Sequence, residues 1–281
     1  AIDKANADDS INTIVLDGAG KAFVAGADVK FFVDKIRADS FPDIYDFTAD
    51  GHKVLNKLES SSKTTIALTT GLSLGGGLEL ALSCDYRIGT RKTQFRFPET
   101  NIGIFPGLGG TQRPARIAGL PAARWAVLAG NFMDARTAAD LGLVTDLVDV
   151  TEVDSTISSL DAKGKPAEKY PATPVNPESK IAKFANSFYS DENMDTLLNG
   201  GCPDGFDPED KLVSRQLKSL SRTAPIALRM ASDLIDAAGT TELMTGLGQE
   251  LDNLEAIFST NDALEGLSAL IEGRKPTYQN S

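Results

Sequence analysis

Residues 64–90 read TTIALTTGLSLGGGLELALSCDYRIGT, and this stretch decides the fold class. The β-branched and apolar run 64–71 predicts a buried strand. The glycines at 75–77 are followed by LELALSC, which predicts a short helix, and residues 85–89 predict another short strand. A strand, a glycine turn, a helix and a strand in succession indicate an α/β architecture.

The same alternation continues on both sides of this stretch. Residues 11–16 predict a buried strand, and residues 43–60 carry apolar positions at helical spacing. KAFVAGADVKFF (21–32) is interpreted as a glycine-containing loop. Further strands are predicted at 94–97 and 143–150, with helices between them that begin at PGLGGTQRPARIAGL, 106–120.

Composition shifts divide the chain into three regions. The core is predicted over 1–150 and a helical C-terminal region over 211–281. Between them, residues 151–210 are interpreted as a connector or insertion, because they contain a polar, proline-rich run and a second loop rich in Gly and Pro. Residues 1–9 lack an initiator Met, which favours a chain that starts inside a larger domain.

The composition excludes several classes of protein. The formal charge of −11 argues against a broad nucleic-acid surface. Cys84 and Cys202 are too few for a disulfide framework. No apolar run is long enough to span a bilayer, and the first residues show no signal-peptide pattern. We therefore expect a cytoplasmic protein without nucleic acid or membrane as partner.

Residues 71–75 spell G-x-S-x-G, the sequence of a hydrolase nucleophile elbow. An α/β-hydrolase places its histidine after the serine, whereas the single histidine, His52, precedes Ser73. His52 lies in a polar predicted helix, where we expect it at the surface. Ser73 is therefore predicted to be a bystander at the end of a buried strand.

The glycines at 75–77 favour a different chemistry. Glycine lets the backbone turn sharply between a strand and a helix, and the unpaired N–H groups of a helix start attract negative charge. The turn could stabilise an oxyanion, although close packing of a helix on a strand would equally explain it. Neither a dinucleotide fingerprint nor a P-loop lysine is present, and no residue cluster predicts a metal site.

Two carboxylates follow the glycine turn. Glu79 falls in the first turn of the predicted helix, and Glu99 comes just after the strand 94–97. Taken singly, each is typical of helix-dipole stabilisation or of a solvated surface. Together with the glycine turn they would provide an acid/base pair beside an oxyanion site.

Three segments in order, AFVAGAD (22–28), residues 71–90 and FPETNIGIFPGLGGTQR (97–113), resemble the successive motifs of the enoyl-CoA hydratase, or crotonase, family. Residues 134–148 and 265–278 resemble its downstream segment and its C-terminal helix. The resemblance implies a spiral of ββα units with a helical C-terminal region that forms homotrimers, often as a dimer of trimers.

The resemblance also implies roles for individual residues. The backbone N–H groups of Ala27 and Gly76 would form the oxyanion hole for an acyl-CoA carbonyl, and Glu79 and Glu99 would hold the water. Which glutamate acts as acid stays open. No cofactor is expected, because coenzyme A is part of the substrate. Other substrate contacts would come from Ala25, Asp28, Lys30, Gly75, Pro106 and Gly107.

Because both glutamates are present, the resemblance favours an enoyl-CoA hydratase for short-chain substrates. The alternatives are an enoyl-CoA isomerase and a non-catalytic acyl-CoA-binding fragment of a larger bifunctional protein, since the family's leading strands are absent from this chain. The long region 151–210 and the segment APIALRMASDLID (224–236) resemble archaeal fusion proteins, in which a 3-hydroxyacyl-CoA dehydrogenase part precedes the hydratase.

Overall fold

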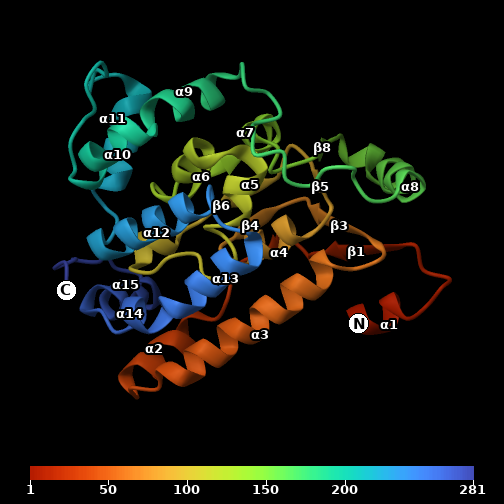
Figure 1. Cartoon of the computed structure of the whole chain (residues 1–281), viewed down its shortest axis with the longest axis horizontal. Helices are drawn as coiled ribbons and strands as arrows, with labels where there is room; N and C mark the ends of the chain where they lie inside the picture. Colours follow the sequence, from red (N-terminus) through yellow and green to blue (C-terminus); the bar gives the residue numbers. More distant parts are fainter.

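The computed structural model describes residues 1–281 and contains two four-stranded sheets (Figure 1). One sheet has the strand order β1-β3-β5-β8 and the other β2-β4-β6-β7. Neighbouring strands are parallel except for β6 and β7. The strands are β1 Thr13–Asp17, β2 Ala22–Val24, β3 Thr64–Thr69, β4 Leu72–Leu74, β5 Tyr86–Gly89, β6 Gln94–Arg96, β7 Met133–Asp134 and β8 Asp146–Leu147.

Successive strands alternate between the two sheets. Strands β1 and β2 are followed by α2 (Val29–Arg37) and α3 (Phe41–Glu59), and β3 and β4 by α4 (Gly76–Ser83). Each turn of the chain adds one strand to each sheet, so Val15 lies opposite Ile66, and Ile66 opposite Tyr86. This arrangement confirms the predicted α/β spiral of ββα units.

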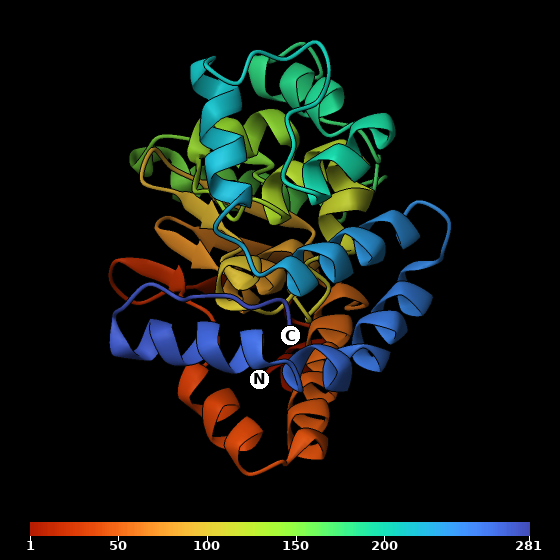
Figure 2. The same cartoon turned by 90° about the vertical axis from the view of Figure 1, so that its left-hand side faces the viewer.

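The helices extend from the sheets to both ends of the molecule (Figures 1 and 2). Helices α2 and α3 lie at one end and α9 to α11 at the other. No helix is both long and apolar enough to cross a membrane. The remaining helices are α1 Ile2–Asn6, α5 Arg113–Ala118, α6 Leu120–Val127, α7 Ala135–Leu141, α8 Val153–Lys163, α9 Lys180–Phe188, α10 Asp191–Leu198, α11 Lys211–Leu220, α12 Pro225–Ala237, α13 Leu243–Asp252, α14 Leu254–Phe258 and α15 Asn261–Glu272, with the 3-10 turns η1 Glu99–Ile102 and η2 Val150–Glu152.

The C-terminal helices share the core of the ββα spiral. A single cluster of buried side chains joins Phe32 of α2, Phe95 of β6 and Leu267 of α15. Helix α15 packs directly against α2 and η1, and Figure 2 shows it crossing beside α2. The C-terminal helix α15 therefore covers α2 and the 3-10 turn η1 that follows β6.

The interpretation of residues 21–32 as a loop was wrong. They contain β2 and the first turn of α2, whose side chain cap is Asp28, which accepts a hydrogen bond from the Lys30 N–H. The helical signal is present, since Phe32 and Val33 are buried on one face. The sequence pattern did not reveal β2, because a strand of three residues depends on its neighbours in the sheet, and the glycine at 26 favoured a loop for the whole segment.

Two other sequence predictions were too long. Of the predicted strand 143–150, β8 keeps two residues. Leu143 and Val144 instead donate to the Ala138 carbonyl at the end of α7, and Asp149 caps η2. The predicted helix at 106–120 begins at Arg113, because the preceding N–H groups donate to buried carboxylates rather than to helix carbonyls.

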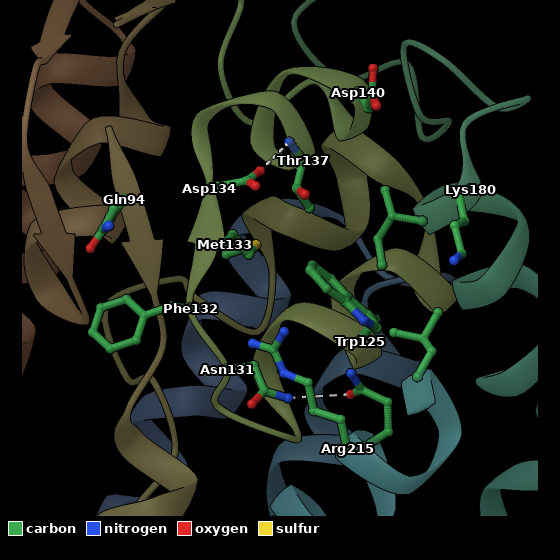
Figure 3. Close-up of a pocket in the computed structure, with 13 residues that line it drawn as sticks. Gln94, Trp125, Asn131, Phe132, Met133, Asp134, Thr137, Asp140, Lys180 and Arg215 are labelled. Carbon is green, nitrogen blue, oxygen red and sulfur yellow. Dashed lines mark hydrogen bonds between the residues drawn. The ribbon is translucent and has the colours of Figure 1, made fainter. Parts of the chain in front are cut away.

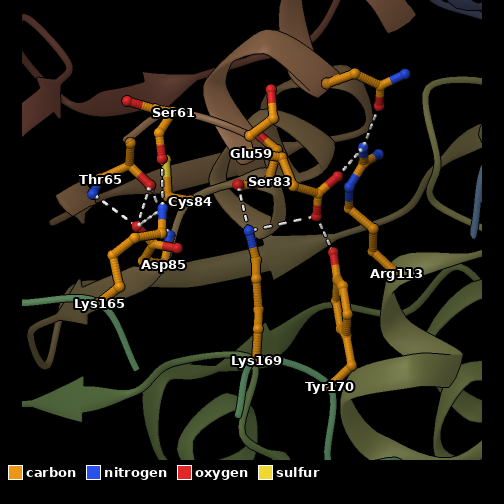
Figure 4. Close-up of polar contacts among 12 residues, drawn as sticks. Glu59, Ser61, Thr65, Ser83, Cys84, Asp85, Arg113, Lys165, Lys169 and Tyr170 are labelled. Atoms are coloured by element: carbon orange, nitrogen blue, oxygen red, sulfur yellow. Dashed lines mark hydrogen bonds and ion pairs between the residues drawn. The ribbon is translucent and has the colours of Figure 1, made fainter. Parts of the chain in front are cut away.

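The segment between α8 and α9 is tied to the core by partly buried ion pairs (Figure 4). Lys165 Nζ donates to Asp85 Oδ2 at 2.9 Å. Lys169 Nζ lies 3.3 Å from Glu59 Oε1 of α3, and the Tyr170 hydroxyl donates to the same oxygen. These contacts hold a polar segment without secondary structure against α3 and α4.

Candidate active site

The glycine turn joins β4 to α4 in a conformation that requires glycine. Gly75 has φ 48° and ψ −123°, a region that L side chains rarely adopt. A Cβ atom at Gly75 would lie 2.1 Å from Glu99 Oε1, and one at Gly77 would lie 2.1 Å from the Val24 carbonyl oxygen. The turn therefore brings the backbone close both to a carboxyl group and to strand β2.

Two backbone N–H groups are available at this turn. Gly76 is the first residue of α4, so its N–H has no acceptor within the helix. Ala27 lies in the loop between β2 and α2, and its N–H donates to no protein atom. Both residues line the same cavity. Two such donors can stabilise negative charge that develops on a carbonyl oxygen.

Glu79 projects from the first turn of α4 and is 2% exposed. Its Oε1 accepts hydrogen bonds from the N–H groups of Leu108 and Gly110, both at 2.7 Å. Burial raises the pKa of Glu79 to about 7, although these two donors and the Arg113 charge favour the ionised form. The carboxyl group therefore titrates near neutral pH.

Glu99 begins η1, three residues after the end of β6, and is 8% exposed. Its Oε2 has no hydrogen-bond partner in the protein. Burial and then the nearby Glu79 charge raise the pKa of Glu99 well above its ordinary value. Glu79 thus has two N–H donors that favour its carboxylate form, whereas Glu99 Oε2 has none.

Both carboxyl groups face a cavity of about 250 Å³. Ala27, Gly75 and Gly76 form one wall. Most of the other lining residues are apolar and come from α2, α3, the segment after η1, α14 and α15; they include Phe32, Phe47, Phe105, Phe258, Leu267 and Leu270. The cavity thus combines two carboxyl groups, two free N–H donors and an apolar wall.

A family model described as enoyl-CoA hydratase/isomerase matches residues 1–281. The chain belongs to this family. A probable enoyl-CoA hydratase from Mycobacterium bovis is 30% identical over 271 residues, which cover 96% of this chain and 81% of that protein. A short-chain-enoyl-CoA hydratase from Clostridium acetobutylicum is 29% identical, over 95% of this chain and 80% of that protein.

The fold of the family is also found in solved structures. A crystal structure of an enoyl-CoA hydratase from Rhodobacter sphaeroides superposes with a TM-score of 0.81 and covers 99% of this chain and 82% of that one. The sequence identity of that pair is 22%, so the likeness concerns the fold.

The structure gathers most of the residues that the family resemblance singled out. Besides the glutamates and the two N–H donors, Ala25, Gly75 and Gly107 line the cavity. The other three predicted contacts lie elsewhere: Asp28 caps α2, Lys30 is exposed on the first turn of that helix, and Pro106 is buried behind the cavity wall.

The hydrolase constellation is not assembled. Ser73 is fully buried in β4, and its Oγ has no hydrogen-bond partner. The expectation that His52 lies at the surface was wrong: it is 4% exposed, and its Nε2 donates to the Gly107 carbonyl at 2.6 Å. Burial lowers the pKa of His52. The histidine therefore holds the loop after η1 instead of serving Ser73.

The hydrogen bonds of residues 108–111 are the part of the site that sequence reasoning missed. The N–H groups of these residues bind Glu79 on one side and Glu250 of α13 on the other. Gly109 has φ 96°, and a Cβ there would lie 1.9 Å from Arg113 Nη1. The adjacent glycines of GLGGT were the available signal, because they mark backbone that approaches other groups closely.

A second cavity, of about 490 Å³, lies between α6, α7, α9 and α11 (Figure 3). Asp134 on its wall caps α7 by accepting from the Thr137 N–H, and Asp140 pairs with Arg136. Trp125 lines this cavity and is 6% exposed. This cavity offers neither a pair of free carboxyl groups nor a glycine turn.

Proposed function

We propose that the chain is an enoyl-CoA hydratase, a hydro-lyase that adds water reversibly to a short-chain 2-enoyl-CoA and gives a 3-hydroxyacyl-CoA. The observation that carries the proposal is the pair of buried carboxyl groups, Glu79 and Glu99, at one glycine turn beside two free N–H donors. The names of the family's hydratase members support the same reaction.

The different surroundings of the two carboxyl groups support different roles for them. Glu79 accepts two N–H hydrogen bonds, which favour its carboxylate, so Glu79 acts as the base. Glu99 has an unpartnered oxygen and a strongly raised pKa, so Glu99 holds the proton and acts as the acid. One proton shared by two neighbouring carboxyl groups is what simultaneous acid and base catalysis requires.

Hydration then proceeds with both groups. Glu79 accepts a proton from water while the water oxygen bonds to the β-carbon of the enoyl thioester. The π electrons move toward the thioester carbonyl, whose oxygen is stabilised by the N–H groups of Ala27 and Gly76. Glu99 delivers its proton to the α-carbon. Transfer of the proton from Glu79 to Glu99 restores the starting state, and the same steps reversed dehydrate a 3-hydroxyacyl-CoA.

The size of the cavity supports a short acyl group. Its volume is about 250 Å³, and Phe32 of α2 stacks on Phe258 of α14 in its wall with ring centroids 5.2 Å apart. A short apolar chain can be desolvated in such a space, whereas a long one would displace the stacked rings.

We further propose a homotrimer or a dimer of trimers, a cytoplasmic location, and an accompanying 3-hydroxyacyl-CoA dehydrogenase part, as the motif resemblance implies. Exposed apolar side chains support an assembly surface. Tyr45 and Val54 of α3 are 45% and 49% exposed, and Leu270 and Ile271 of α15 are 51% and 50% exposed. Light scattering of the purified chain measures the assembly; a monomer at micromolar concentration would contradict it.

The hydratase is tested by the loss of conjugated enoyl-thioester absorbance when crotonyl-CoA is added. We expect Glu79→Gln and Glu99→Gln each to lower kcat by about 10²- to 10⁴-fold, and Glu255→Gln, at an exposed site on α14, to leave it unchanged. Wild-type turnover in either site variant would refute the proposal. Mass spectrometry of the product in H₂¹⁸O separates hydration from isomerisation, which incorporates no oxygen.

A further inference from the structure

A third buried carboxyl group lies next to the site without facing its cavity. Glu250 of α13 is fully buried. It accepts hydrogen bonds from the Gly109 N–H at 2.7 Å, the Thr111 N–H at 3.2 Å and the Thr111 hydroxyl at 2.5 Å. A carboxyl group with so many donors and no access to substrate calls for a role other than proton transfer to the acyl chain.

The four N–H groups from 108 to 111 point alternately to two carboxyl groups. Those of Leu108 and Gly110 bind Glu79, and those of Gly109 and Thr111 bind Glu250. The loop is therefore suspended between α4 and α13. Without an acceptor at residue 250, two buried N–H groups would lose their partners, and the backbone would have to rotate to satisfy them.

Close packing and hydrogen bonds hold this loop from both sides. A Cβ at Gly246, one helical turn before Glu250, would lie 1.8 Å from Gln112 Oε1, so α13 contacts the end of the loop directly. On the other side, His52 Nε2 binds the Gly107 carbonyl, and Arg113 Nη1 donates to the Leu108 carbonyl at 2.9 Å. The carbonyl groups are thus held by α3 and α5, and half of the N–H groups by Glu250.

We propose that Glu250 is a positioning residue: by accepting from Gly109 and Thr111 it directs the N–H groups of Leu108 and Gly110 at Glu79 and so keeps the general base ionised. This inference rests on the proposed hydratase function. Its essential property is acceptor capacity at residue 250, and the charge of Glu250 is secondary.

The charged and titratable groups that face Glu250 are His52 from α3, Glu79 from α4 and Arg113 from α5. His52 Nε2 is 3.5 Å from Glu250 Oε2 and donates to Gly107. Burial, and then the Glu79 charge, raises the pKa of Glu250 to about 8, which its hydrogen-bond donors and Arg113 oppose. Acceptor capacity and charge must therefore be separated by experiment.

Two neutral variants separate them. Glu250→Gln keeps one acceptor oxygen, whereas Glu250→Met has a similar length and no oxygen. Both remove the charge. We expect kcat for crotonyl-CoA hydration to fall roughly a hundredfold in Glu250→Met and less in Glu250→Gln, with KM within about threefold of wild type because residue 250 does not reach the cavity. Glu255→Met and Glu255→Gln, at an exposed site, are the matched controls.

The decisive readout is the titration of Glu79, followed by ¹³C NMR of labelled glutamate carboxyl groups and assigned with Glu79→Gln. Loss of the Leu108 and Gly110 donors raises the pKa of Glu79, so the order of pKa should be wild type, then Glu250→Gln, then Glu250→Met as the highest. Loss of a neighbouring negative charge alone would lower the pKa equally in both variants. Equal variants, or an unchanged or lowered pKa of Glu79 in folded protein, overturn the inference.

Thr111→Val gives a milder variant if Glu250→Met does not fold. It removes the hydroxyl donor to Glu250 and keeps the N–H, so we expect a shift of Glu79 in the same upward direction and of smaller size. An unmoved Glu79 in this variant contradicts the inference. The NMR titration needs no turnover: a wild type that does not hydrate crotonyl-CoA but shows the ordered shifts would refute the proposed function and keep the positioning role.

Discussion

Glu59 and Glu79 are carboxyl groups on neighbouring helices, α3 and α4, with opposite properties. The Glu59 side chain is 14% exposed, and Glu79 is 2% exposed. Burial disfavours the ionised form of both. Glu59 is 2.9 Å from Arg113 Nη2 and 3.3 Å from Lys169 Nζ, and these cations lower its pKa in spite of burial (Figure 4). Glu79 is bound by two N–H groups, and its pKa rises to about 7.

The difference teaches that the partners of a buried carboxyl group, and not burial itself, decide what it does. Two cations favour the ionised form of Glu59, which joins α3 to α5 and to the segment 164–172. Neutral N–H donors leave Glu79 able to exchange a proton near neutral pH. The pKa of Glu99, whose Oε2 has no hydrogen-bond partner, is also raised, to well above its ordinary value. We therefore expect the first region to stabilise the fold and the second to perform the proposed chemistry.

The largest effect on activity is expected for Glu99→Gln. The neutral amide cannot deliver a proton to the α-carbon, so kcat should fall by about 10²- to 10⁴-fold. The free energy of unfolding should stay equal or rise, because the variant removes a buried acid that lacks a partner. Steady-state kinetics and urea unfolding of the same preparation measure kcat and the free energy of unfolding. A large loss of unfolding free energy would show that Glu99, like Glu59, stabilises the fold.

The converse variant, Glu59→Gln, should affect stability. It leaves Arg113 and Lys169 without their anion, and breaking a buried pair typically costs about 3 kcal/mol of unfolding free energy. The folded fraction should keep kcat within a few-fold of wild type, since Glu59 does not line the cavity. The measurement is urea unfolding, with kcat normalised to folded protein. A hundredfold loss of kcat with unchanged unfolding free energy would show that Glu59 acts in the reaction and does not stabilise the fold.

The pH dependence of stability should separate the two regions. Folded Glu79 retains its proton up to about pH 7, whereas the unfolded side chain releases it near its ordinary pKa of 4.5. The free energy of unfolding therefore falls as pH rises between these values, by roughly 3 kcal/mol from this group. His52, with its lowered pKa, acts in the opposite direction. The difference between wild type and Glu79→Gln isolates the Glu79 contribution, and a pH-independent difference would contradict it.

For Glu59 the sign is reversed. Its folded pKa is lowered, so its stabilising contribution is present above its ordinary pKa of 4.5 and is lost as pH falls through the folded value. Below pH 4.5, wild type should lose stability faster than Glu59→Gln does. Parallel unfolding curves of the two proteins in acid would show that the cations do not control this carboxyl group.

The smallest effect is expected for Lys169→Met. Arg113 remains beside Glu59, and Lys169 is partly accessible, so the loss should be about 1 kcal/mol of unfolding free energy with kcat unchanged. Hydrogen exchange of residues 164–172 should increase, because Lys169 also donates to the Ser83 carbonyl at 2.6 Å. Unchanged exchange would mean that Lys165 and Tyr170 hold the segment without Lys169.

The sequence by itself determined the alternation of strands and helices, the glycine turn, and the two glutamates that follow it. These are local features: Gly75 needs a positive φ, and Glu79 is the fourth residue of the helix that the turn begins. The resemblance to the family motifs added the expected roles of Ala27, in the motif 22–28, and of Glu99, in the motif 97–113.

The tertiary structure decided the rest. Whether His52 is a surface residue or a buried ligand of Gly107 depends on a loop 55 positions later, and Glu250 reaches Gly109 across 141 positions. The surroundings of Glu79 likewise depend on long-range contacts, because its two N–H donors come from residues 29 and 31 positions away. Burial and hydrogen-bond partners set a carboxyl group's pKa, and both exist only once distant segments have packed together.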